Sequence, residues 1–433
     1  MKKSKVFLLA AVGLLSVGVL TACSSSSKTS GKTYNYVYGG DPATLDYVST
    51  NKKNMTTAVS NGVDGLFEND QYGNLKPSVA ENWSVSQDGL TYTYKIRKGV
   101  KWYTSDGEEY ANVTAKDFVT GLKHAADTNS EAIYLLQNSV KGLNDYLSGA
   151  NKDFSNVGIK AVDDYTLQYT LSQPEPYWNS KLTYSVTWPV NEDFLKSKGK
   201  DFGKSTDPTS ILYNGPYLLK SLTTKSSIEF TKNENYWDKD NVYFDTVKLT
   251  YDDGTDQESL ERNFTDGVYN LARLYPTSSN YSKVEKQYKD NIFYTQPGAA
   301  VEGVGINIDR QTYDHTSKEN DQQKTSTKTA LLNKDFRQAL GFAIDRTNYA
   351  AQLNGKEGGS TAVRNIYVKP DFVQADGKDF GTMVMDQLPA YGDEWSGVNL
   401  ADSQDGLYNP EKAKAEFAKA KEALQAEGVQ FPI

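Results

Sequence analysis

The chain has 433 residues, enough for two or three domains of about 150 residues each. Its apolar content of 38% and charged content of 24% are typical of a globular protein, and its net charge of −8 argues against nucleic-acid binding. A single cysteine excludes intrachain disulfides and cysteine-built metal sites. The two histidines, His124 and His315, lie too far apart in the sequence to suggest a zinc site. We therefore expect no metal and no cofactor.

The chain opens with a membrane-export leader. Three lysines in the first five residues precede an apolar run over residues 6–20, which is shorter than the ~20 residues that span a bilayer. Small residues then precede Cys23, as in the bacterial lipoprotein box. This resemblance implies a signal peptide over residues 1–22 and an acylated Cys23, followed by a serine-rich tether up to residue 32. The alternative is an ordinary secretory signal with an incidental cysteine.

The first half of the body alternates between predicted strands and helices. Tyrosines at every second position predict a strand over residues 33–38, and a helix is expected over residues 54–67. A strand is predicted over residues 90–96, a helix with Thr114 as N-cap follows, and two strands flank a turn at residues 163–164.

The second half continues this order. Strands are predicted around residues 218–219, 228–230 and 243–251, and a helix is predicted from Asp256 to Phe264. Residues 315–329 are polar and predict a surface loop, whereas residues 336–344 predict an amphipathic helix. The repeated strand–helix order favours an α/β fold.

The last residues predict a helix followed by the opening of a strand. Asn409 is a candidate N-cap with proline after it, and residues 429–433 have a strand-like pattern. A chain rarely stops at the start of a new element, so we expect this sequence to be a truncated form of a longer protein.

Motifs for catalysis are weak. The segment Gly203-Lys204-Ser205 resembles the end of a phosphate-binding loop, but its upstream glycine has the wrong spacing, so a surface turn is favoured. The acidic cluster over residues 252–258 lacks the ligand spacing of a calcium loop, and a turn before a helix explains it. With no nucleophile elbow, no free cysteine and two scattered histidines, the chain is not expected to be an enzyme.

An ordered series of short motifs runs through the chain. In sequence order they are DPATLD (41–46), DGLFE (64–68), GNLKPSVAENW (73–83), DGLTYTY (88–94), RKGVKW (97–102), VTAKDF (113–118), NGPY (214–217), NENYWD (233–238), FRQAL (336–340) and IDR (344–346). This series resembles the extracellular oligopeptide-binding lipoproteins of ABC importers, of the streptococcal Ami/Ali type within solute-binding protein family 5.

The resemblance implies a type II periplasmic-binding-protein-like α/β fold with two lobes. Lobe one would comprise residues 33–70 and 172–300, with a β-rich subdomain inserted over residues 71–171. Residues 301–433 would begin an incomplete lobe two. An extended peptide would lie between the lobes and bind through its main chain, as in strand addition.

The resemblance also implies individual peptide-binding positions. A loop that follows the DPATLD motif places Asn51, Lys52 and Lys53 at the ligand, and Tyr134 matches an aromatic ring of the inserted subdomain. Further positions are implied near the boundary of the lobes: Arg273, Leu274, Val301 and Glu302.

The implied function is the capture of extracellular oligopeptides and their delivery to the permease subunits of an ABC transporter. The protein would be a monomer, held on the extracellular face of the cell membrane by its lipid anchor. Two alternatives stay open: a receptor for another solute, such as a metal chelate or a sugar, and a surface peptide sensor without a transport role.

Overall fold

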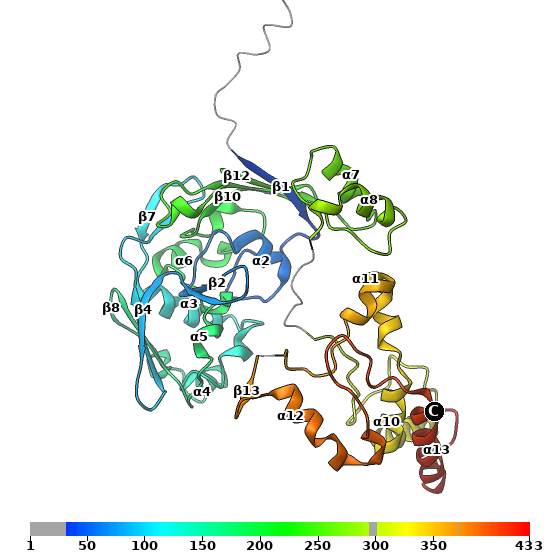
Figure 1. Ribbon diagram of the computed structural model, residues 1–433. Coiled ribbons are helices and arrows are strands. Elements are labelled where there is room, and N and C mark those ends of the chain that lie inside the picture. Colours follow the sequence, from blue (N-terminus) through cyan, green and yellow to red (C-terminus); the bar gives the residue numbers. More distant parts are fainter. Residues whose placement is uncertain (1–31, 294–300, 371) are drawn as a thin grey trace, which may run out of the picture. The chain divides into compact units, whose positions relative to one another are not determined.

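The computed structural model describes residues 32–293, 301–370 and 372–433 (Figure 1). These residues form two compact units. Unit 1 contains the described residues up to Asp256 together with Asn263–Ala272, and unit 2 contains Gln257–Arg262 and Arg273–Ile433. The leader and Cys23 lie outside the described residues. The lobe boundaries that the resemblance implies, including the inserted subdomain, stay predictions.

One four-stranded sheet of unit 1 has the order β1-β12-β11-β10 (Figure 1). Its strands are β1 (Thr33–Tyr38), β10 (Tyr217–Thr223), β11 (Ser227–Lys232) and β12 (Thr246–Tyr251). β1 runs parallel to β12, and the other pairs are antiparallel. The strands predicted for these regions are confirmed. The backbone N–H of Lys32 donates to Asp245 Oδ2 at 2.8 Å, and Asp245 N–H donates to the Lys32 carbonyl at 2.8 Å, which fixes the point where the chain enters β1.

A second four-stranded sheet of unit 1 has the order β4-β5-β9-β8 and is antiparallel throughout. Its strands are β4 (Ala80–Val85), β5 (Thr91–Ile96), β8 (Ile159–Asp163) and β9 (Thr166–Thr170). Tyr94 on β5 and Tyr169 on β9 are fully buried, as the alternation of side chains across a strand requires. The predicted strand over residues 90–96 and the pair around residues 163–164 are therefore confirmed.

Shorter strands and helices complete unit 1. The hairpins are β2 (Phe67–Asn69) with β3 (Leu75–Pro77) and β6 (Lys101–Tyr103) with β7 (Glu109–Asn112). The helices are α2 (Lys53–Val59), α3 (Ala115–Asp127), α4 (Leu143–Leu147), α5 (Trp178–Lys181) and α6 (Glu192–Lys198). α3 begins where predicted, because Thr114 and Asp117 form a capping box in which Asp117 Oδ2 accepts the Thr114 N–H at 2.8 Å.

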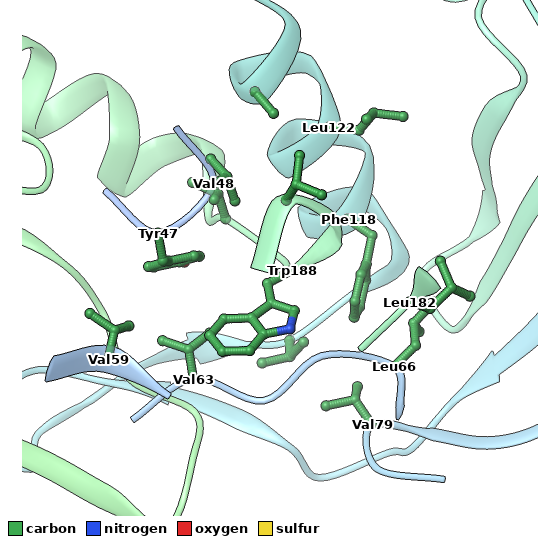
Figure 2. Close-up of a cluster of buried hydrophobic side chains, with 14 of the residues drawn as sticks. Tyr47, Val48, Val59, Val63, Leu66, Val79, Phe118, Leu122, Leu182 and Trp188 are labelled. Carbon is green, nitrogen blue, oxygen red and sulfur yellow. The ribbon is translucent and has the colours of Figure 1, made fainter. Parts of the chain in front are cut away.

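Trp188 lies at the centre of a cluster of buried apolar side chains in unit 1 (Figure 2). Its ring lies 5.9 Å from that of Tyr47, measured between ring centroids. Two glycines allow the surrounding backbone to approach this tryptophan. A Cβ on Gly65 would lie 2.6 Å from Trp188 Cδ1, and a Cβ on Gly121 of α3 would lie 2.2 Å from the Trp188 carbonyl oxygen. Packing this close is what makes the core specific.

The helix predicted over residues 54–67 is too long. α2 ends at Val59, although Ala58, Val63 and Leu66 are all buried. The backbone after α2 has other partners, since the Gly62 carbonyl accepts the N–H groups of Asn214 and Gly215 at 3.1 and 2.9 Å. These long-range hydrogen bonds replace the intrahelical ones.

Unit 2 is largely helical in its described residues. Its helices are α8 (Tyr281–Gln287), α9 (Asp321–Leu332), α10 (Lys334–Ala343), α11 (Arg346–Thr361), α12 (Phe380–Gln387) and α13 (Pro410–Ala426), and α7 (Ser259–Thr265) starts in unit 2 and ends in unit 1. One small hairpin joins β13 (Gln374–Ala375) and β14 (Lys378–Asp379). α10 and α13 confirm the predicted helices, and Asn409 caps α13 by accepting the Lys412 N–H at 3.0 Å. α7 begins three residues later than the predicted Asp256.

Two predictions for unit 2 are wrong. The polar segment 315–329 was expected to be a loop, but α9 starts at Asp321 because Asn320 caps it and Ala330 packs into a buried cluster with Ala420 and Leu424. Ser326 is buried on α9 as well, so tertiary packing of a narrow face outweighs the polar composition. Residues 429–433 form no strand, since Val429 is buried and Phe431 and Ile433 pack on the same cluster.

No helix among the described residues is long and apolar enough to cross a membrane.

Candidate functional site

The segment of residues 44–53 has a buried first part and an exposed last part. Leu45, Tyr47 and Val48 are buried, and the Tyr47 hydroxyl donates to the Pro189 carbonyl at 2.7 Å. Residues 51–53, predicted to contact a peptide, are exposed at the start of α2. The buried residues therefore hold the loop in place while Asn51, Lys52 and Lys53 are exposed to solvent.

Gly203 holds one side of this loop. Its carbonyl accepts the Leu45 N–H at 2.7 Å and the Thr44 hydroxyl at 2.8 Å. A Cβ on Gly203 would lie 2.3 Å from the Asp46 backbone nitrogen, and its φ of +69° is one that glycine favours. The glycine of the phosphate-loop-like segment is thus buried in a turn that packs against the loop.

His124 of α3 holds the same loop from another side. Its Nε2 lies 2.8 Å from Asp46 Oδ2, and both side chains are largely buried. The other carboxylate oxygen of Asp46, Oδ1, is buried without a hydrogen-bond partner among the described residues. This histidine therefore serves as a partner for a carboxylate in the structure.

Glu131 joins the loop to the turn that carries Tyr134. Its Oε2 accepts the Thr50 hydroxyl at 2.7 Å and the Asn51 N–H at 3.4 Å, and its Oε1 lies 3.5 Å from Lys52 Nζ. Its own N–H donates to the Ser49 carbonyl at 3.0 Å. Hydrogen bonding, first of all from Thr50, lowers the pKa of Glu131. The carboxylate is thus held in its charged form between two segments of unit 1.

Tyr134 lies on a short 3₁₀ turn, Ile133–Leu135, three residues after Glu131. Ile133 and Leu136 are buried on either side, whereas the Tyr134 side chain is 59% exposed. The turn is therefore anchored while its ring faces solvent. The structure brings four predicted residues, Asn51, Lys52, Lys53 and Tyr134, into one region of unit 1 through the Glu131 contacts.

The other predicted positions belong to unit 2. Arg273 is exposed and its guanidinium carbon lies 4.8 Å from the centroid of the Tyr275 ring, whereas Leu274 is half-buried. Val301 is half-buried and Glu302 is exposed, in a stretch without regular secondary structure. The assignment of all eight residues to a peptide site stays a prediction.

Unit 1 also contains a buried acid away from this loop. Asp64 accepts the Tyr236 hydroxyl at 2.8 Å and the Trp237 Nε1–H at 3.2 Å. Burial nevertheless raises the pKa of Asp64 to about 7, because desolvation outweighs both hydrogen bonds. Asp64 joins the β2 region to the segment before β12, which is a structural role.

The acidic cluster over residues 252–258 forms a turn. Asp252 Oδ1 accepts the Gly254 N–H at 2.7 Å, and Asp253 Oδ1 accepts the Thr255 N–H at 3.0 Å. Within residues 32–293, 301–370 and 372–433, no three histidine, cysteine or acidic side chains are grouped so that they could hold a metal ion.

A cavity of about 260 Å³ lies in unit 2, and none of the predicted site residues lines it. The lining residues are Lys334, Arg337, Gln338, Gly341, Phe342, Trp395 and Leu407.

Sequence reasoning missed Glu131 and assigned His124 no role. Glu131 meets Thr50 across 81 positions and His124 meets Asp46 across 78, so no local pattern announces either contact. The only signal available was the presence of Glu131 close to a residue that was already a candidate, Tyr134.

The fold is that of the solute-binding proteins to which the chain is similar. The family model of the bacterial extracellular solute-binding proteins, family 5 Middle, matches residues 74–431, so the chain belongs to this family. In solved structures, the chain is similar to the pheromone receptor PrgZ (TM-score 0.67, 24% identity, 91% of this chain and 68% of that one). It is also similar to Listeria monocytogenes OppA bound to peptide (TM-score 0.64, 24% identity, 93% and 70%). These two likenesses concern the fold.

The sequence is also similar to named relatives of this family. It is 69% identical to the oligopeptide-binding protein AmiA and 64% identical to the oligopeptide-binding protein AliA of Streptococcus pneumoniae serotype 4. Each match covers the whole of this chain and 66% of the relative, so the chain spans just under two thirds of their length. A dipeptide-binding protein of Lactococcus lactis subsp. cremoris is 30% identical over 98% of this chain and 70% of that protein.

Proposed function

We propose that this protein captures oligopeptides outside the cell and delivers them to an ABC importer. The observation that carries the proposal is its 59–69% identity, over the whole chain, to streptococcal proteins named as oligopeptide-binding. The contacts that Glu131 makes between two segments of unit 1 support it. One segment presents the polar residues 51–53, and the other presents the ring of Tyr134.

Oligopeptides have chemistry that suits such a surface. Every peptide unit carries an N–H and a carbonyl, and a buried one left unpaired costs ~1–3 kcal/mol. A receptor that satisfies these groups through loop backbone and side chains such as Asn51 binds many sequences. The Tyr134 ring would pack on whichever side chain lies beside it. The protein would need no bond-making chemistry for this task.

The proposal includes a lipid anchor at Cys23 on the outer face of the cell membrane. The basic start, the short apolar run and the small residues before the single cysteine support it. The anchor would keep the receptor beside the permease subunits that accept its cargo.

Calorimetric titration of the purified chain with a mixed oligopeptide pool, a metal chelate and a set of sugars tests the capture of peptides. Heat released by the peptide pool alone is the expected result, and binding of either other ligand in its place would overturn it. Delivery is tested separately by the uptake of a labelled peptide into cells that lack the gene. Peptide binding with unchanged uptake would make the protein a peptide sensor.

A further inference from the structure

Two aromatic side chains are exposed beside the point where the chain enters unit 1. Tyr243 is 68% exposed and Phe244 is 38% exposed, and both precede β12. Phe244 lies next to the first strand, since its ring centroid is 5.4 Å from that of Tyr34. Thr33, the first residue of β1, pairs with Thr246. This Tyr243–Phe244 pair is therefore within a few residues of the chain that leads back to Cys23.

The backbone around the pair is held firmly. The Tyr217 hydroxyl donates to the Phe244 carbonyl at 3.0 Å, and Lys232 Nζ donates to the Val242 carbonyl at 3.0 Å. Lys232 N–H also donates to the Asp245 carbonyl at 2.8 Å. Because the main chain is fixed on both sides of the pair, the two rings are presented to solvent by a rigid support.

The length of chain before Lys32 places this face close to a membrane. Nine residues, 24–32, separate Cys23 from the body, and nine residues span at most about 32 Å when fully extended. Acyl chains on Cys23 would therefore hold the Tyr243–Phe244 pair near the lipid headgroups. Tyrosine favours that region because its ring is partly desolvated there while its hydroxyl stays in water, and phenylalanine buries its ring at the same boundary.

We infer that the face of unit 1 around Tyr243 and Phe244 rests on the headgroup region of a phospholipid bilayer. This inference depends on the proposed acylation of Cys23 and goes beyond it, since an anchor alone leaves the body free to rotate. Charges of both signs lie beside the pair: Lys239 adjoins Asp240 in the sequence, and the Lys32 N–H donates to Asp245 Oδ2 at 2.8 Å. The contact is thus made by the rings, and it should change little with salt concentration.

A contact with the bilayer would fix which side of unit 1 faces away from the membrane. Figure 1 shows β1, β10 and β12 along one side of unit 1, with α4 and α5 away from it. With the β1 side on the membrane, the opposite side of unit 1 faces the medium.

The single cysteine makes the test direct. Acylation of Cys23 consumes the only thiol of the chain, so Tyr243→Cys or Phe244→Cys introduces a unique site for a polarity-sensitive fluorophore. The acylated full-length variants are placed in protein-free vesicles of phosphatidylcholine and phosphatidylglycerol. Tyr177→Cys is the matched control, because Tyr177 is 58% exposed and immediately precedes α5.

We expect labels at positions 243 and 244 to shift to shorter emission wavelengths, to lose quenching by iodide and to be quenched by nitroxide lipids. The label at position 177 should keep its aqueous emission, and added salt should not reverse the difference. Equal iodide quenching at 243 and 177 in the acylated protein would overturn the membrane contact and leave the anchor intact. Protection seen only when transporter subunits are present would also overturn it, in favour of a protein partner. A chain without acyl mass on Cys23 would overturn the anchor and the contact together.

Discussion

The Thr50 hydroxyl donates a hydrogen bond of 2.7 Å to Glu131 Oε2, which joins two positions 81 residues apart in the chain. This hydrogen bond links the loop that presents Asn51–Lys53 to the turn that presents Tyr134. A ligand that touches both segments would meet them at a fixed spacing, and fixed spacing reduces the entropy that binding must overcome.

Removing the Glu131 side chain should therefore weaken peptide binding. We expect Glu131→Ala to raise the dissociation constant for an oligopeptide roughly three- to tenfold, as for the loss of one hydrogen bond. Glu131→Gln, which keeps an acceptor for Thr50, should have a smaller effect. Calorimetric titration measures both. Glu108→Ala is the control, since Glu108 is also exposed in unit 1. An unchanged affinity in Glu131→Ala would show that the loop needs no such support.

The exposed ring of Tyr134 should contribute directly to binding. Tyr134→Ala is expected to weaken peptide affinity about tenfold or more, because burying an aromatic side chain is worth ~1.5–3 kcal/mol. Its thermal unfolding should not change, since the ring is 59% exposed in the free protein. Tyr72→Ala, at a tyrosine that is 72% exposed in the β2–β3 turn, serves for comparison. Equal losses of affinity in the two variants would argue against a specific role for Tyr134.

Cys23→Ser should release the protein from the membrane. A serine hydroxyl is not a substrate for thioether formation, so the variant should carry no acyl mass and should leave the membrane fraction. Mass spectrometry and cell fractionation measure these outcomes, with a Ser24→Ala chain as the control beside the thiol. Acyl labelling that persists in Cys23→Ser would refute the lipid anchor.

The stability of unit 1 should decrease with rising pH because of Asp64. Its pKa is raised from 3.8 to about 7 in the folded protein, so the folded state binds the proton more tightly than the unfolded state. The contribution of the protonated Asp64 to the free energy of unfolding is complete below about pH 3.8, and it is lost as the pH rises to about 7. Over that window the shift corresponds to about 4 kcal/mol. Denaturant titrations between pH 4 and pH 8 measure it.

Asp64→Asn isolates this effect from other groups. Asparagine keeps an oxygen for Tyr236 and Trp237 and does not titrate. The free energy of unfolding of the variant should therefore increase relative to that of the parent chain as the pH rises. Burial also raises the pKa of Asp117, to about 6, but that group is common to both chains. Parallel pH profiles for parent and variant would contradict the assignment.

Adding one methyl group to a glycine should have opposite effects in α3 and α10. Gly121→Ala places a Cβ 2.2 Å from the Trp188 carbonyl oxygen, and such overpacking should cost about 1–3 kcal/mol. Gly341→Ala meets no atom within 4 Å beyond the backbone of its own helix and its chain neighbours. This variant should be neutral or stabilising, because alanine is the better helix former. Denaturant unfolding of both variants measures the difference. A stable Gly121→Ala chain would mean that α3 can move away from Trp188.

Most elements with strong local signals were predictable. The tyrosine alternation of β1, the capping box of α3 and the Asn409 cap of α13 are encoded within a few residues. Elements that depend on distant partners were not. α2 ends early because Gly62 bonds to residues 214 and 215, and α9 forms because Ala330 meets α13.

The candidate site likewise contains residues that were predicted and supporting residues that were not. Residues 51–53 and Tyr134 followed from the resemblance, and the structure brings them together in unit 1. Their support, from Glu131, His124 and Gly203, consists of contacts across more than seventy positions. Contacts at such separations leave no periodicity or spacing in the sequence.

The pairing of β1 with β12 determines when this sheet can close during synthesis. β1 is made first, but its partner ends at Tyr251, so more than two hundred residues must emerge before the two strands can meet. β10, β11 and β12 are neighbours in sequence and can form hairpins as they appear, whereas the long separation makes β1 the last strand to join. Until then, the segment that carries Cys23 stays attached to an unpaired strand. The proposed acylation of Cys23 can therefore precede the completion of this sheet.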